Sequence, residues 1–412
     1  MDLTEELITL DLSRQGYNSI PTSVFTDGSI KWLILSNNNL REIPGAIGEN
    51  RVLTRLALND NKIQKIHPNI GLLKHLSWID LTRNRLSSLP IEMRHLNRVQ
   101  GLGLSENEFE EIPECVYHLF ALRKFGFFSN RIQTISPNIK NLSRLVKIDL
   151  SNNQIRRIPD EFCELKNLTW LNLSNNQLET LPENMEKLRY LEELGLGCNR
   201  LTTLPSLKNL SRLRILPIFK NRLCKTPEIS LQNIEKLDLS DNKLTEFPNK
   251  LIYSRTLRYL NLKRNLIRKI DFDCEQRGLS SGISMIDISE NLLESLPFKF
   301  FTTFSKVTTI RLSGNPFRPH AEQLPQECPS LLQLCYTKYL NKRGWVADLW
   351  LRYKFGPSMI CDICGNEFVG KAIDGYSIAP SSDEMSNFVI KKTICSVWCY
   401  WKDYEGIFRK EI

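Results

Sequence analysis

Four cysteines near the end of the printed sequence have the spacing of a metal site. They form two close pairs with 30 residues between them: Cys361 with Cys364, and Cys395 with Cys399. Two such pairs can bring four thiolates to one tetrahedral centre, which is the usual arrangement of a structural zinc ion. Four protein ligands leave no open position for an activated water molecule. The spacing therefore predicts one structural zinc ion, and the alternative is four ordinary thiols in a small core.

The rest of the sequence offers no second set of this kind. All five histidines precede residue 357, so only thiolates are available as zinc ligands in the last segment. One four-ligand site also argues against a RING domain, which holds two zinc ions. No Ser/His/Asp, Cys/His or paired-carboxylate set occurs at a usable spacing in the preceding part of the chain. We therefore expect a protein that is not an enzyme.

A second motif precedes the cysteines, in ECPSLLQLCYTKYL from Glu327. Leu331, Cys335 and Tyr339 are each four residues apart, so they would form one stripe along a helix. Pro329 suits the first turn of that helix. The helix could cap the open end of a repeat array, or it could dock into a partner protein.

These motifs follow a long repeat, which must position them. The unit is L-x-x-L-x-L-x-x-N-x-L-x-x-L-P, as in LTWLNLSNNQLETLP from Leu168. Starting at Asn38, eight repeat asparagines are spaced 23 residues apart, and five more follow as far as Asn315. With Gln15 in a first, degenerate unit, the sequence contains 14 units. This pattern is that of leucine-rich repeats, and it predicts an α/β solenoid, a horseshoe with a parallel concave sheet.

Each part of the unit has a physical task. Alternating leucines point inward from a short strand, and the asparagine amide satisfies backbone groups at the turn that follows. Leu178 and Leu181 should close the inside of their coil, and Pro182 should prevent a second strand. The segment from Glu183 then predicts one helical or 3₁₀ turn. Pro217 should disturb the sheet, because it removes a ladder donor.

The outward positions of the predicted strands describe the concave face. The middle position is often Asp or Asn, which we expect to pair laterally, and five glycines gather between the fifth and tenth units beside large residues. Glycines would lower the floor while aromatic and lysine side chains form walls, which is typical of a binding hot spot. The alternative is that the aromatic rings only pack on one another. The predicted substrate-binding residues are Trp78, Lys124, Phe128, Lys147, Trp170 and Phe219.

The order of the motifs adds a resemblance. Repeats, PSLLQLC, LWLRY, CDICG and ICSVWCY follow one another as in the leucine-rich repeat substrate receptors of elongin BC–cullin ubiquitin ligases. The resemblance implies that Leu331, Cys335 and the bulkier Tyr339 enter a groove of elongin C. It implies that Trp345 to Phe355 lie near a cullin and that the concave face holds a protein substrate. Ala347 stands where such receptors usually have a proline, so the resemblance does not indicate which cullin.

We therefore expect three parts: leucine-rich repeats over 1–318, a capping or elongin C-binding helical segment over 319–356, and a zinc-binding tail over 357–412. The expected function is a non-enzymatic adaptor that presents a protein substrate for ubiquitination. The alternative is an intracellular signalling scaffold of the Ras-pathway type, which has similar 23-residue units. Such scaffolds generally lack a four-cysteine tail. A catalytic ligase would need a much larger C-terminal domain.

Composition narrows the partners and the location. Among 412 residues, 55 Lys and Arg against 46 Asp and Glu give a net charge of +9, scattered along the chain. Scattered charge argues against nucleic acid as the partner. No apolar run reaches the roughly 18 residues that a membrane helix needs. The acidic start of the sequence lacks a secretory signal, so we expect a cytoplasmic or nuclear protein whose cysteines are thiols or metal ligands.

Overall fold

The computed structural model describes residues 8–271, 282–297, 300, 307–317, 359–360, 367–368, 373–380 and 387–394. The chain forms two compact units, Met1–Asn242 and Lys243–Ile412. The predicted elongin C-binding residues Leu331, Cys335 and Tyr339 lie outside the described residues. So do the predicted zinc ligands, Cys361, Cys364, Cys395 and Cys399. Those predictions, and the boundaries at 318 and 356, stay predictions.

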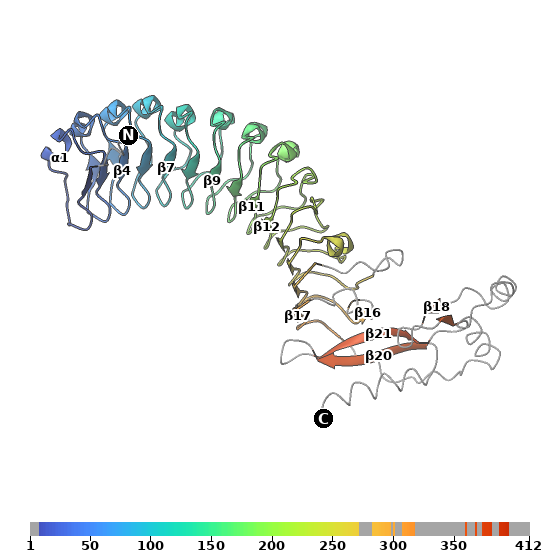
Figure 1. The fold of residues 1–412 in the computed structure, drawn as a ribbon. Helices are drawn as coiled ribbons and strands as arrows, with labels where there is room; N and C mark the ends of the chain where they lie inside the picture. Colours follow the sequence, from blue (N-terminus) through green and yellow to red (C-terminus); the bar gives the residue numbers. More distant parts are fainter. Residues whose placement is uncertain are drawn as a thin grey trace, which may run out of the picture. The chain divides into compact units, whose positions relative to one another are not determined.

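Short parallel strands form one side of the first unit (Figure 1). Each has three residues, and neighbours in the sheet follow chain order, with β3 (Glu42–Ile43) and β5 (Lys65–Ile66) forming a separate pair. The strands of the sheet are β1 (Thr9–Asp11), β2 (Trp32–Ile34), β4 (Arg55–Ala57), β6 (Trp78–Asp80), β7 (Gly101–Gly103), β8 (Lys124–Gly126), β9 (Lys147–Asp149), β10 (Trp170–Asn172), β11 (Glu193–Gly195), β12 (Ile215–Pro217) and β13 (Lys236–Asp238).

The second unit continues the same repeat. Its repeat strands are β14 (Tyr259–Asn261), β15 (Met285–Asp287) and β17 (Thr309–Arg311), again parallel. Fourteen repeat strands are thus found in the described part of the chain, one for each predicted unit. Other strands of this unit are β16 (Leu296–Pro297), β18 (Met359–Ile360), β19 (Glu367–Phe368), β20 (Ile373–Pro380) and β21 (Asn387–Ile394). Strand β21 pairs antiparallel with β20 and parallel with β16.

Helical turns alternate with the strands of the sheet as far as β11. The α-helix α1 (Ser23–Thr26) is followed by 3₁₀ turns, as the proline-preceded segment from Glu183 predicted. Prolines at or next to the cap fix a backbone that suits the first helical turn. The turns are η1 (Gly45–Glu49), η2 (Pro68–Leu72), η3 (Ile91–His95), η4 (Glu114–His118), η5 (Pro137–Asn141), η6 (Asp160–Glu164), η7 (Glu183–Lys187) and, in the second unit, η8 (Asn249–Tyr253).

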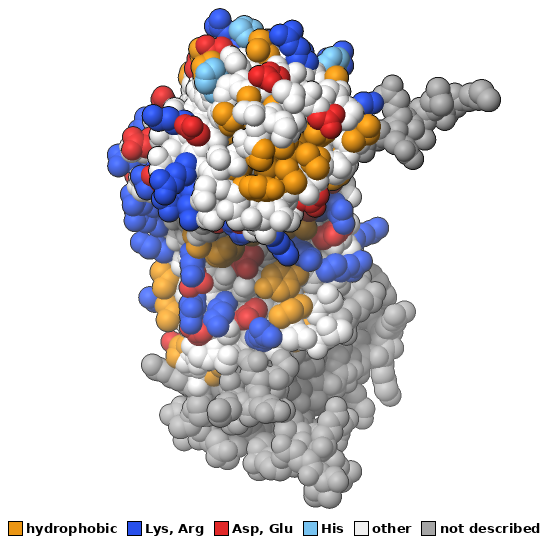
Figure 2. Space-filling model, turned by 90° about the vertical axis from the view of Figure 1, so that its left-hand side faces the viewer, with side chains coloured by type: hydrophobic (Ala, Val, Ile, Leu, Met, Phe, Trp, Pro, Cys, Tyr) orange, Lys and Arg blue, Asp and Glu red, His pale blue; other side chains and the backbone are white. Residues whose placement is uncertain are grey.

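Stacking buries the inward leucines. Leu173, Leu178 and Leu181 are all buried inside their coil, as the pattern predicted. At the first repeat the situation differs, because Ile8 is 49% exposed and Leu10 and Leu12 are only half-buried. In the view onto the N-terminal end, hydrophobic side chains form a visible patch (Figure 2). A repeat thus needs a neighbour on both sides to complete its core.

The repeat asparagines form a ladder that joins successive coils. In one step of it, Asn153 Oδ1 accepts a hydrogen bond from the Ile132 backbone N–H (3.1 Å). Its Nδ2 donates to the carbonyls of Phe127 (3.0 Å) and Leu150 (3.1 Å). The same pattern recurs in the first unit from Asn38 to Asn242. These amides satisfy buried backbone groups at the turn, which confirms the predicted role of the asparagine.

Polar side chains and one proline alter the pairing of individual strands. Lateral pairing of the Asp and Asn side chains is confirmed for Asp287, which lies 3.8 Å from Arg311 on the neighbouring strand. Asp149 and Asn172 differ, because their Oδ1 atoms accept from the N–H of Ser151 (3.0 Å) and Ser174 (3.1 Å). A short polar side chain reaches the backbone two residues further along the chain more readily than it reaches the next strand.

At Pro217, β12 pairs with β11 through one residue pair but with β13 through three. Proline has no N–H to complete the ladder toward β11.

Candidate binding surface

The outward residues of the sheet form columns that run across the strands. The first residue of each strand defines a first column, and the third residue defines a second column. The residue two positions after the strand defines a third column. The first column contains Trp78 of β6, Gly101 of β7, Lys124 of β8, Lys147 of β9 and Trp170 of β10, in that order. Phe128 and Phe219 occupy the third column. We call Trp78, Lys124, Phe128, Lys147 and Trp170 the central concave patch.

The structure brings these five predicted residues together within the run of five strands from β6 to β10. With neighbouring strands about 4.8 Å apart, Trp78 and Trp170 are separated by roughly 19 Å. Phe219 lies beyond them, after β12, about the same distance from Phe128. An extended peptide of about six residues would span either distance. The patch therefore has the size of a linear recognition segment.

Glycines in this region do not leave an open floor, which corrects the sequence-based expectation. A Cβ atom built on Gly101 would overlap the Trp78 ring, and one on Gly197 would lie 2.5 Å from Cε1 of Phe219. Each aromatic ring therefore lies against the glycine of a neighbouring strand. Trp78 is nevertheless 41% exposed, so part of its ring is available to a partner.

Trp170 and Phe128 are held differently. The indole Nε1 of Trp170 donates a hydrogen bond to Glu193 Oε2 (2.9 Å), which fixes the orientation of the ring. Phe128 forms no aromatic pair among the described residues, although both it and Trp170 are half-buried. A half-buried aromatic side chain whose orientation is already fixed, as that of Trp170 is, loses little entropy when a partner covers it.

Two lysines supply charge between the tryptophans. Lys124 and Lys147 are directly opposite each other on β8 and β9. Both are exposed, and neither forms an ion pair in the part of the chain that the structure describes. Like charges placed opposite each other on adjacent strands destabilise a sheet unless an anion relieves them. An acidic side chain of a partner, flanked by apolar groups, would complement this patch.

Trp32 and Arg55 extend the same column and were missed by sequence reasoning. They pair in register with each other, and Arg55 pairs in register with Trp78. The Arg55 guanidinium carbon lies 5.3 Å from the centroid of the Trp32 ring, which is a cation–π distance. The signal was present in the sequence, because Trp32 occupies the same repeat position as Trp78 and Trp170.

The described residues show no grouping of three or more His, Cys, Asp or Glu side chains that could hold a metal ion.

Burial raises the pKa of the Cys115 thiol to about 12 and that of the Cys163 thiol to about 11. Both thiols are therefore protonated and unreactive at neutral pH, as expected of core residues. Cys224, in contrast, is exposed. Within the described ranges, no helix is long and apolar enough to cross a membrane.

Comparisons with known proteins agree with this fold. A family model described as "Leucine-rich repeat region" matches residues 114–268, and one described as "Leucine rich repeat" matches residues 51–109. The leucine-rich repeat serine/threonine-protein kinase 1 of Caenorhabditis elegans is 32% identical over 106 residues, which are 26% of this chain and 4% of that kinase. The mouse kinase of the same name is 29% identical over 131 residues, 29% of this chain and 6% of that kinase.

Solved structures resemble the repeat region over a longer stretch. A leucine-rich repeat protein of Leptospira interrogans matches with a TM-score of 0.67 and 28% identity, over 74% of this chain and 77% of that one. An internalin of Listeria monocytogenes matches in fold, with a TM-score of 0.58 and 20% identity, over 75% of this chain and 82% of that one. The regular asparagine ladder, the fourteen parallel strands and these matches together show that the chain belongs to the leucine-rich repeat protein family.

Proposed function

We propose that this protein is a non-enzymatic adaptor that binds a protein partner on its concave face. The observation that carries the proposal is the central concave patch. There, Trp78 and Trp170 lie on either side of two lysines on adjacent strands, and neither lysine forms an ion pair with a described residue. Aromatic side chains around a charged group are the usual composition of a binding hot spot. The matches to two protein kinases cover 26% and 29% of this chain and only 4% and 6% of those kinases, so they do not bring kinase activity to this chain.

The specific form of the proposal is that the adaptor is the substrate-recognition subunit of an elongin BC–cullin ubiquitin ligase. Its support is the order of sequence motifs after the repeats, in residues that the structure does not describe. Leu331, Cys335 and Tyr339 would dock on elongin C, and a four-cysteine zinc site would follow. The concave face would then hold a substrate while the last part of the chain recruits the ligase.

Replacing Leu331 and Cys335 together by alanine should abolish co-purification of elongin C with the tagged full-length protein. The reason is that both side chains would be buried in the partner groove, where truncation of anchors removes most of the binding energy. The readout is quantitative mass spectrometry of the purified complex, with Cys224→Ala as a control for loss of a thiol elsewhere. Retained elongin C in the double variant would exclude this helix. No elongin C with the unaltered protein would favour the signalling scaffold.

Replacing Phe128 and Trp170 together by alanine should sharply weaken capture of the protein partner while elongin C binding continues. Truncating a buried aromatic anchor typically costs at least about 2 kcal/mol of binding free energy. Proximity labelling in cells compares the altered and unaltered proteins. The control variant replaces Leu72 and Ile91, which are 41% and 44% exposed on η2 and η3, away from the strands. An unchanged set of partners in the patch variant would show that recognition uses another surface.

A further inference from the structure

A second surface lies beside the sheet, on the segments that lead from each helical turn into the next strand. We call these segments, 51–54, 74–77, 97–100, 120–123, 143–146 and 166–169, the lead-in face. Each contains one Lys or Arg and none contains Asp or Glu. The return segments on the other side of the coil differ, as in EFEE over 108–111 and QIRR over 154–157. The cations of the lead-in face are Arg51, Lys74, Arg98, Arg123, Arg144 and Lys166.

Most of these cations are not neutralised by neighbours. Lys166 pairs with Glu164 (3.6 Å), within its own repeat. Arg51, Arg123 and Arg144 are exposed and form no ion pair in the described part of the chain. A row of unpaired cations with no acidic neighbour on the same face creates a positive potential that favours an anionic partner.

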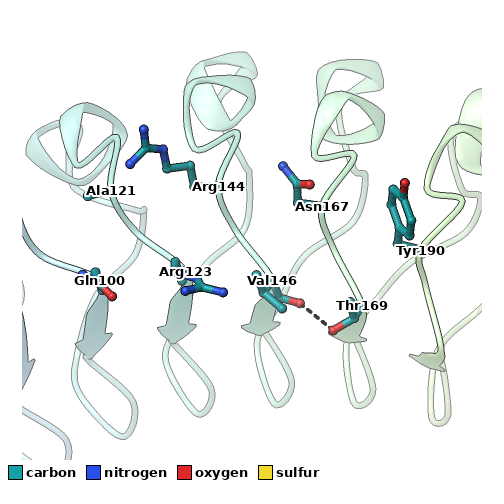
Figure 3. Close-up of a pocket in the computed structure, with 8 residues that line it drawn as sticks. All are labelled: Gln100, Ala121, Arg123, Arg144, Val146, Asn167, Thr169 and Tyr190. Atoms are coloured by element: carbon teal, nitrogen blue, oxygen red, sulfur yellow. Dashed lines mark hydrogen bonds between the residues drawn. The ribbon is translucent and has the colours of Figure 1, made fainter.

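The central part of this face is hollowed into a groove. Its cavity has a volume of about 540 Å³ and lies between the helical turns and the strands (Figure 3). Gln100 and Ala121 lie at one end, and Arg123, Arg144 and Val146 follow toward the middle (Figure 3). At the other end stands Tyr190, which is 47% exposed.

The walls of the groove are partly fixed. Thr169 Oγ1 donates a hydrogen bond to the Val146 carbonyl (3.2 Å), which holds the two segments together (Figure 3). The Arg212 guanidinium carbon lies 4.6 Å from the centroid of the Tyr190 ring and supports it from the following repeat. The lead-in segment that contains Tyr190 carries both Arg189 and Glu192, so it adds no net charge to the groove.

We propose that this groove binds an acidic, extended polypeptide segment with an aliphatic side chain next to its carboxylates. Arginine guanidinium groups bind carboxylates in a bidentate manner, so Arg123 and Arg144 would each hold one acidic side chain. The floor at Ala121 and Val146 would accept the aliphatic group. A single-stranded nucleic acid fits less well, because successive bases need several aromatic platforms, and Tyr190 is the one aromatic residue among those that line the groove.

Binding of a fluorescein-labelled ten-residue peptide tests the proposal, using the full-length protein and fluorescence anisotropy. The peptide carries glutamates on both sides of two leucines, and a lysine-for-glutamate peptide and an oligouridylate of equal length serve as comparison probes. We expect the acidic peptide to bind, and the R123E/R144E variant to bind it at least about tenfold more weakly. The A121W variant, which fills the groove without changing charge, should weaken binding as well.

Two matched variants assign the effect to the groove. R156E/R157E reverses two exposed arginines on the opposite return segment and should leave the affinity within about twofold. K124E/K147E alters the central concave patch and should also leave it nearly unchanged. The proposal is overturned if the acidic peptide does not bind, if R156E/R157E weakens it equally, or if only K124E/K147E weakens it. Tighter binding of oligouridylate than of the peptide would overturn it in favour of a phosphate-backbone ligand.

Discussion

The Asn153→Ala variant is expected to lose about 2 to 4 kcal/mol of unfolding free energy in the repeat region. Its Oδ1 atom is the acceptor for the Ile132 N–H, which would be left buried without a partner. An orphaned buried donor costs about 1 to 3 kcal/mol, and the lost donations from Nδ2 and the small cavity add to that. Equilibrium unfolding in urea, followed by circular dichroism, measures the change.

The loss of unfolding free energy is limited because the carbonyl groups of the ladder accept hydrogen bonds from more than one asparagine. The carbonyls of Phe127 and Leu150 keep second donors in the variant, from Asn130 Nδ2 (3.3 Å) and Asn176 Nδ2 (2.9 Å). Only the Ile132 N–H loses its sole partner. The control is Asn97→Ala, an exposed asparagine outside the ladder, which should change stability by no more than about 0.5 kcal/mol. Equal loss in the two variants would contradict a structural role for the repeat amide.

The repeat architecture was predictable because its signal recurs. The spacing that starts at Asn38 fixes where each strand ends, and the turn at Glu183 follows from Pro182 and the leucine spacing. A single unit would be ambiguous, since one short apolar run can be a strand or a helix. Repetition removes that ambiguity, because only stacking of similar coils buries the inward leucines of each one.

Contacts between neighbouring coils were harder to predict. The sequence shows Trp78 and Gly101 in the same column, but not that the ring would lie on the glycine, which depends on the side-chain rotamer. The same applies to Asp149, whose side chain could reach either the next strand or the Ser151 N–H. The sequence alone does not indicate which of two groups a side chain contacts when it can reach both.

The lead-in cations show a different limit. Along the chain, Arg123 and Arg144 are separated by 20 residues and look like scattered charge. The coil period places them side by side on one groove, so that their potentials add. The net charge of the chain and the runs of like charge along its sequence therefore underestimate how basic one face of a solenoid can be. Counting charge by position within the repeat would have found it.

The largest effect is expected from removing the proposed zinc ion from residues 357–412. The full-length protein should contain about one zinc per chain, held by four thiolates. Binding of structural zinc contributes about 10 to 16 kcal/mol of apparent free energy in zinc-finger peptides, and that energy is also folding energy. Cys361→Ser should therefore lower the zinc content and expose this segment to protease, while the repeats keep their own cooperative unfolding transition.

Elemental analysis and limited proteolysis measure the two consequences separately. Cys224→Ser, which removes an exposed thiol within the repeats, is the matched control and should leave the zinc content unchanged. Acidification should release the metal, because the ligands must be thiolates and protons compete for them. Metal-free protein whose last segment still resists protease would show that Cys361, Cys364, Cys395 and Cys399 are ordinary thiols of a small core. Zinc loss in Cys361→Ser with elongin C binding retained would show that the zinc site and the docking helix are stable independently of each other.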